Sequence, residues 1–287
     1  MLALQLVVNG LVVAGLLGLV GLGLALIFGV MRVVNFAHGE FITLGAYTTW
    51  LLAGTLGLSP LLGIPLSFIV AGALGWVLQA GLISRLVGRP PIDALMVTYA
   101  LSVLGVGLFS VSFGGDFRSY ASGPSGELRL GGLSIGLRSL TVLVACLVLA
   151  GGVMLLLRSA KVGLGLRALA QNRDAAASCG IDVRRAERIA FALAVGLAGV
   201  AGSLISLIGT TTPNVGDDWV LDGFVVVVIG GMGSIAGSLL AAAGIGLVQS
   251  FAGYALDDAW AQIIIYLLLY GTLLLRPQGV LGRREAV

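Results

Sequence analysis

Charged residues are scarce in this chain. Asp, Glu, Lys and Arg make up 10% of its 287 residues, and the sequence has one histidine and two cysteines. Uncharged stretches long enough to cross a membrane occupy most of the sequence, namely 1–31, 41–84, 94–115, 139–157, 189–216, 223–256 and 259–275. With 58% hydrophobic residues and a mean hydropathy of +1.09, the composition excludes a soluble globular protein and indicates an integral membrane protein.

The apolar stretches indicate helices. A membrane barrel would show segments of about ten residues with alternating polarity, whereas runs such as LTVLVACLVLAGGVMLLL are continuously apolar. Prolines divide the 41–84 stretch and glycines divide the 223–256 stretch, so each of these can span twice. We therefore expect an all-α integral membrane protein with about eight to nine transmembrane helices, some of them broken, in a single transmembrane domain over residues 1–287.

Basic residues concentrate between positions 158 and 188, where seven of them outnumber three acidic residues. The positive-inside rule places this segment in the cytoplasm, and counting spans then predicts an external N-terminus and a cytoplasmic C-terminus. Residues 114–138 become an external loop. Within it, SGELRLGGLSIGL alternates apolar and other residues around Gly131-Gly132, which favours a β-hairpin over an irregular loop.

Several chemical motifs are missing. The sequence has no G-x-x-x-x-G-K-[ST] and only one lysine, Lys161, which excludes a P-loop ATPase. If ATP drives this protein, it binds to a partner, and we expect no cofactor on this chain. A single histidine leaves too few ligands for a metal site and no second histidine for a hydrolytic centre. The two cysteines, Cys146 in a span and Cys179 in the basic segment, are too far apart to pair.

The histidine lies in VVNFAHGEF, residues 33–41, where Asn35, His38 and Glu40 interrupt the apolar sequence. Ionisable residues at membrane depth are costly and are therefore functional candidates; Asp222 is a further one. The Asn-Phe-Ala sequence lacks the proline and the second copy expected of a water channel. We interpret this stretch as a polar break at the inner end of the first helix. Its side chains either satisfy freed backbone groups or form a gate or solute path, and both interpretations stay open.

The basic segment 159–188 contains LRALAQNRDAAASCG, which is rich in alanine and other good helix formers. We predict a short helix that ends at Gly180, because glycine is the preferred residue just beyond a helix C-terminus. By its residues alone, this segment is either a solvated connector or a contact surface for an ATPase partner.

Four ordered blocks resemble the branched-chain amino acid ABC-importer permeases, over about residues 10 to 284: GLGLALIFGVMRVVNFAHGEFITLGAY, SAKVGLGLRALAQNRDAAASCGIDVRR, GGMGSIAGSLLAA and RPQGVLGR. The resemblance implies a bacterial inner-membrane permease that pairs with a second permease subunit, homologous or identical. It further implies two cytoplasmic ABC ATPases, an external solute-binding protein, and a coupling role for the 159–188 segment. The residues implied to couple are Arg167, Gln171, Asn172, Arg173, Asp174, Gly180 and Ile181.

The substrate is less constrained, because the family also contains urea and short-chain amide permeases. GAYTT, LAQNRDAAASCGI and PNVGDDWVLDGFVVVVIGG resemble that branch, whereas SFGGDFRSYASGPSGELRL resembles the usual loop of neither. We expect inward transport of a branched-chain or related amino acid by alternating access, with urea or a short-chain amide as the alternative. A self-sufficient channel or secondary carrier is a third hypothesis, disfavoured because no clear ion-coupling carboxylate pair lies deep in a span. A net charge of +3 gives no indication of a nucleic-acid partner.

Overall fold

A computed structural model describes residues 2–130 and 133–282. Within these ranges, seven helices are long and apolar enough to cross a membrane. They are α1 (Leu2–Met31), α3 (Gly63–Gly81, with short 3-10 turns at Pro60–Leu62 and Ile83–Arg85), α4 (Pro91–Phe113), α5 (Leu137–Ser159), α8 (Val183–Ile208), α10 (Ile235–Ala255) and α11 (Asp258–Leu275). The helical membrane architecture predicted from the sequence is confirmed.

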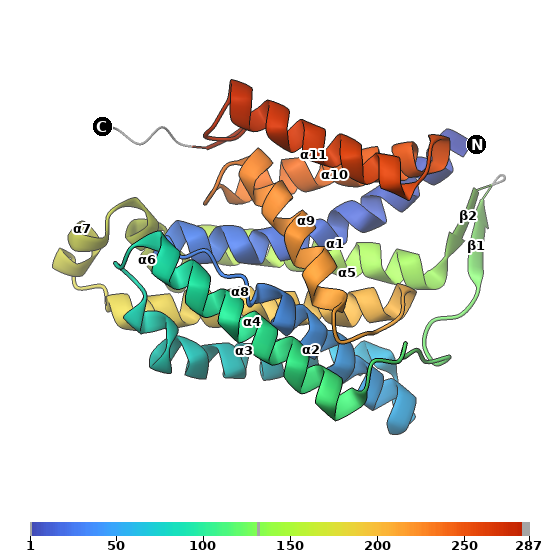
Figure 1. Ribbon diagram of the computed structural model, residues 1–287, viewed down its shortest axis with the longest axis horizontal. Coiled ribbons are helices and arrows are strands. Elements are labelled where there is room, and N and C mark those ends of the chain that lie inside the picture. Colours follow the sequence, from blue (N-terminus) through green and yellow to red (C-terminus); the bar gives the residue numbers. More distant parts are fainter. Residues whose placement is uncertain (1, 131–132, 283–287) are drawn as a thin grey trace.

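Two shorter helices complete the apolar segments. Helix α2 (His38–Trp50) continues into a π-helical turn, Leu51–Thr55, and α9 spans Val215–Gly230. The chain breaks at 56–59 and at 231–234, within the two stretches predicted to divide. Together with the seven long helices, α2 and α9 match the predicted number of segments. The long helices lie roughly side by side, whereas α9 crosses them steeply (Figure 1).

Helices α1 and α8 form the centre of the bundle, and most of their side chains are buried. Lipid gives no hydrophobic drive for helix association, so close backbone approach has to hold the helices together. Gly199 of α8 lies against the Ser67 carbonyl of α3, and Gly202 lies against the Ile42 carbonyl of α2. The small residues of α8 are therefore packing sites for two neighbouring helices.

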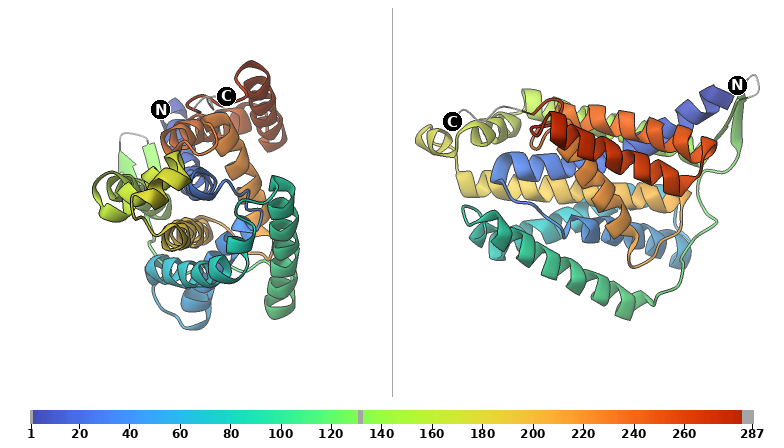
Figure 2. Two further views of the ribbon diagram at one scale, coloured as in Figure 1. Left: turned by 90° about the vertical axis from the view of Figure 1, so that its left-hand side faces the viewer. Right: turned by 45° about the horizontal axis from the view of Figure 1, so that its top comes forward.

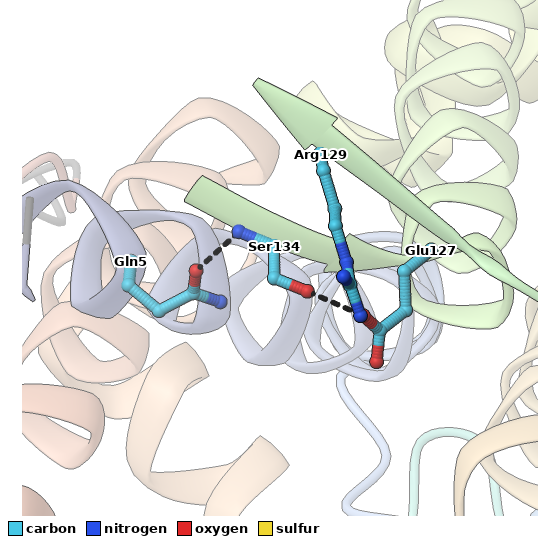
Figure 3. A network of polar contacts seen from close by, with 4 residues as sticks. All are labelled: Gln5, Glu127, Arg129 and Ser134. Carbon is cyan, nitrogen blue, oxygen red and sulfur yellow. Dashed lines mark hydrogen bonds and ion pairs between the residues drawn. The ribbon is translucent and has the colours of Figure 1, made fainter. Parts of the chain in front are cut away.

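One end of the bundle carries a β-hairpin, and we call it the hairpin end. Strands β1 (Glu127–Leu130) and β2 (Leu133–Gly136) pair antiparallel, which confirms the predicted hairpin; its turn at Gly131-Gly132 lies outside the described residues. The Ser134 N–H donates to Gln5 Oε1 at 3.2 Å, so the start of α1 lies at this end too (Figure 3). The Ser134 hydroxyl and the Arg129 guanidinium both donate to Glu127 Oε2 and lower the pKa of Glu127.

The opposite end carries α6 (Lys161–Gln171) and α7 (Arg173–Ser178), which project beyond the bundle, and we call it the basic end (Figures 1 and 2). The prediction of a single helix in this segment is wrong, because two helices form. Asn172 adopts an extended backbone (φ −156°, ψ 113°) and its Oδ1 accepts the Ala175 N–H at 3.0 Å. Asparagine is a preferred N-cap residue, so Asn172 favours the start of a second helix, α7, over the continuation of α6.

The predicted helix end at Gly180 is confirmed. Gly180 lies in the left-handed region (φ 82°), and its N–H donates to the Ala177 carbonyl at 2.9 Å. The next N–H, of Ile181, donates to the Ala176 carbonyl at 3.1 Å. These two bonds form the glycine-terminated Schellman arrangement, which satisfies carbonyls that a helix end would otherwise leave without partners.

Candidate functional site

The polar break between α1 and α2 begins where α1 ends and brings His38 back alongside that helix. Helix α1 ends where Arg32 adopts a left-handed backbone (φ 53°), and residues 33–37 then return alongside α1. The His38 imidazole packs against Gly23, where an added methyl group would lie 2.8 Å from its Cε1. Gly23 precedes the end of α1 at Met31 by about two helical turns, or roughly 12 Å. The break thus begins at the end of the first helix, as expected, while His38 lies about two turns back along α1 from that end.

His38 and Asn35 belong to the interior of the bundle. His38 is fully buried, and the Gly23 position that it faces also adjoins the carbonyl of Ala194, near the middle of α8. Asn35 is 1% exposed, and neither polar atom of its amide has a hydrogen-bond partner within the described ranges. Burial of these two polar side chains within apolar helices therefore costs free energy.

Helix α4 supplies the hydrogen bonds that the break needs. The Phe36 N–H donates to Thr98 Oγ1 at 3.2 Å, and the Thr98 hydroxyl lies 3.3 Å from the Val34 carbonyl. A backbone that leaves helical geometry in a membrane requires such partners. Thr98 was missed in the sequence because one threonine in an apolar span carries no pattern. Its contacts support the structural interpretation of the break.

Glu40, in the first turn of α2, faces α4. Its side chain is 9% exposed, and Oε1 accepts the Ser102 hydroxyl at 2.9 Å. The second oxygen, Oε2, is buried and has no hydrogen-bond partner in the described part of the chain. Gly105 makes room for this carboxylate, since a methyl group there would lie 2.9 Å from Oε2. The positive end of the α2 dipole favours a carboxylate at this position.

The starts of α2 and α9 meet beside Glu40. The Gly216 N–H donates to Thr43 Oγ1 at 3.0 Å, and Gly39 and Gly216 pack backbone against backbone. Asp217 follows and is near enough for its charge to act on Glu40. No sequence pattern singled out Asp217, because its proximity to Glu40 depends on how the start of α9 packs against the start of α2.

Aromatic side chains adjoin the same junction of α2, α4 and α9. The Phe36 ring lies 4.9 Å from that of Phe224 on α9 and 6.3 Å from that of Tyr99 on α4, centroid to centroid. Phe36 and Phe224 are half-buried, and Tyr99 is exposed. The junction thus combines a buried carboxylate with a partly open apolar surface.

Asp222 lies apart from this group. It is half-buried in the middle of α9, and its Oδ1 accepts the Gln262 Nε2–H of α11 at 2.9 Å. In the sequence, Asp222 directly precedes the uncharged stretch 223–256. The helix starts earlier, at Val215, and its first two residues, Val215 and Gly216, are buried. The structure therefore groups Glu40 with Asp217 and pairs Asp222 with α11.

The predicted coupling residues lie on the surface of the basic end. All are exposed except Ile181, which is half-buried; the set is Arg167, Gln171, Asn172, Arg173, Asp174, Gly180 and Ile181. Arg173 joins this surface to the bundle, because its guanidinium lies 2.7 Å from the carboxylate of Glu187 on α8. Glu187 is 2% exposed. The sequence did not single it out, since it appeared as one charge in a basic segment.

Known proteins resemble this chain over nearly its whole length. Residues 6–273 match the family described as the permease component of the branched-chain amino acid transport system. The high-affinity branched-chain amino acid transport system permease protein BraD of Pseudomonas aeruginosa is 27% identical, over 98% of this chain and 96% of that protein. The probable permease protein LivH of Methanocaldococcus jannaschii is 28% identical, over 96% of this chain and 91% of its own length. LivH of Escherichia coli K12 is 25% identical, over 98% of this chain and 96% of its own length. No solved structure matches the chain.

Proposed function

The chain belongs to the family of branched-chain amino acid transport permease components, and we propose that it is the permease subunit of an ATP-driven importer for branched-chain amino acids. It is a multi-pass protein of the inner membrane. The relatives named as branched-chain amino acid permeases cover nearly its whole length, which supports this substrate class. ATP is bound and hydrolysed on partner subunits, and this chain holds no cofactor.

The basic end faces the cytoplasm, and the hairpin end with the N-terminus faces outward. Seven basic residues between 158 and 188 support this orientation through the positive-inside rule. Two ABC ATPases bind at α6 and α7, a second permease subunit packs beside this one, and a solute-binding protein docks on the outer face.

The observation that carries the proposal is the path from the exposed α7 to the polar break. Arg173 ties α7 to Glu187 on α8, and α8 reaches the break through Ala194, beside His38. Further along, α8 contacts α2 backbone to backbone at Gly202 and Ile42. Because packed helices move as bodies, closure of the ATPases on α7 displaces α8 and, with it, α2.

Helix α4 is the element free to respond. Its buried residues are small or polar, Ala94, Thr98 and Ser102, and most of its apolar side chains face outward. Hydrogen bonds between membrane helices contribute on average about 0.6 kcal/mol each. Parting α4 from α2 therefore costs little, as alternating access requires. Asn35, His38, Glu40 and Asp222 are the side chains of this chain proposed to form the gate or solute path.

A reconstituted importer tests the function. The full chain is co-expressed with the ATPase, permease and binding-protein subunits that its own genome encodes beside it. The complex is placed in proteoliposomes, and uptake of radiolabelled leucine is measured. We expect uptake only with ATP on the ATPase side and binding protein on the other. Uptake by this chain alone without ATP would indicate a channel or carrier, and ATP-driven uptake of urea instead of leucine would indicate the amide branch.

Changing Asn172, Arg173 and Asp174 together to alanine tests the coupling surface. ATP hydrolysis should continue while leucine uptake is lost, with the protein still inserted in the membrane. Wild-type uptake in this variant would remove the coupling role from α7.

A further inference from the structure

Glu40 holds a buried carboxylate whose hydrogen bonding is incomplete. Its Oε1 has one donor, Ser102, and its Oε2 has none in the described part of the chain. An ionised carboxylate usually accepts several hydrogen bonds, and leaving one oxygen buried without a donor costs free energy. The neighbouring charge that acts on it, Asp217, is another carboxylate and offers no compensation. A cationic donor arriving at Oε2 would therefore be strongly favoured.

Only one element has to move for such a donor to reach Glu40. Ser102 and Gly105, both on α4, lie against the carboxylate. The other buried hydrogen bonds of α4 run from Thr98 to the break and within α4 itself. Separation of α4 from α2 therefore exposes Glu40 and its free oxygen without unpacking α1 or α8.

The surroundings match an amino acid with an apolar side chain. Tyr99 lies one helical turn before Ser102, and its ring adjoins that of Phe36, which in turn adjoins Phe224. Phe36 precedes α2 and Phe224 is on α9, so their two rings stay in place when α4 moves and remain available to the side chain of a solute bound at Glu40. Aromatic and aliphatic lining with a few positioned polar groups is the common composition of small-molecule sites.

We propose that Glu40 binds the α-ammonium group of the transported amino acid when α4 moves away, and that Phe36 and Phe224 contact the solute side chain. This inference rests on the proposed function and names the solute contact within it. Ser102 keeps the carboxylate partly satisfied when no solute is bound. It follows that solutes without an ammonium group, such as urea or amides, lack the group that this site recognises.

Two matched variants separate this role from a structural clamp between α2 and α4. Glu40→Gln removes the charge but keeps an oxygen that accepts the Ser102 hydroxyl. Ser102→Ala removes that hydrogen bond but keeps the carboxylate. Each variant is assembled into the full importer, and leucine uptake, ATP hydrolysis stimulated by the binding protein, and the yield of monodisperse complex are measured.

We expect Glu40→Gln to lower leucine uptake at least about tenfold, as loss of one partner of a desolvated charge pair does. Stimulated ATP hydrolysis and complex yield should stay near wild type, and Ser102→Ala should keep most of its uptake. Normal uptake in Glu40→Gln, or a larger loss in Ser102→Ala than in Glu40→Gln, would overturn the inference. Glu40 would then have only the structural role of holding α2 against α4.

Should Glu40→Gln fail to assemble, Glu40→Asp carries the test, because it keeps the charge but withdraws it by one methylene group. The inference then requires a raised KM for leucine, and an unchanged KM overturns it. A wild-type importer without ATP-driven leucine uptake would instead refute the proposed function, so the two failures are distinguishable.

Discussion

The Arg173 guanidinium of α7 lies 2.7 Å from the carboxylate of Glu187 on α8, and this ion pair joins an exposed surface helix to the buried centre of the bundle. Arg173 is about half exposed, whereas Glu187 is almost fully buried. Removing the arginine leaves a buried carboxylate without its partner. The pair therefore links α7 to α8, and its disruption should lower the stability of the protein.

We predict that Arg173→Ala lowers the stability of the complex by about 1–3 kcal/mol, less than for a fully buried pair because Arg173 is partly solvated. Leucine transported per ATP hydrolysed should fall as well. Thermal unfolding in detergent and paired uptake and hydrolysis assays measure the two effects. Arg185→Ala is the matched control, since it removes an equal charge from the exposed start of α8. Equal behaviour of the two variants would contradict the prediction.

The close crossing of α2 and α8 predicts a strong effect of Gly202→Ala. A methyl group at Gly202 would collide with the Ile42 carbonyl and lie 3.0 Å from the Ala46 nitrogen, both backbone atoms that cannot yield separately. We expect little or no folded protein, measured as monodisperse yield after extraction. Gly244→Ala on α10 should be tolerated, because none of the described residues comes within 4 Å of its added methyl group. Normal yield of Gly202→Ala would show that the two helices are farther apart.

Thr98→Val tests how the break is held. The change keeps the side-chain shape but removes the acceptor for the Phe36 N–H. We expect a loss of stability of about 0.6–1.7 kcal/mol, the range found for such bonds in membranes. Thermal unfolding measures it. Thr141→Val is the control, because among the described residues the Thr141 hydroxyl donates to the Leu137 carbonyl of its own helix and not to another helix. A larger loss in the control would argue against a special role for Thr98.

The hairpin network predicts an altered titration of Glu127. Bonds from Ser134 and Arg129 hold its pKa below the ordinary value. Because the folded pKa is lowered, the network is intact at neutral pH and is lost only as the pH falls through that lowered pKa. Carboxyl NMR of the labelled protein should show the pKa rising in Ser134→Ala. An unchanged pKa would mean that the Ser134 bond does not form in solution.

Local chemistry explains what could be predicted at the basic end and in the hairpin. A glycine in a left-handed conformation ends a helix wherever it stands, and strand alternation around Gly-Gly defines a hairpin within a few residues. Asn172 shows the limit of such reasoning. Its neighbours are good helix formers, but a competing cap divides the helix, and propensity alone does not decide between the two.

The sequence by itself determined the membrane class, the number of apolar segments, the family and the candidate residues, because apolar length and linear motifs are properties of the chain. Only the tertiary structure decided the packing of His38 against α1, the pairing of Glu187 with Arg173, and the placing of Glu40 beside α4 and Asp217. Those relationships arise from contacts between helices distant in sequence, several of them at glycines. No single segment records them, since each depends on where a second segment folds.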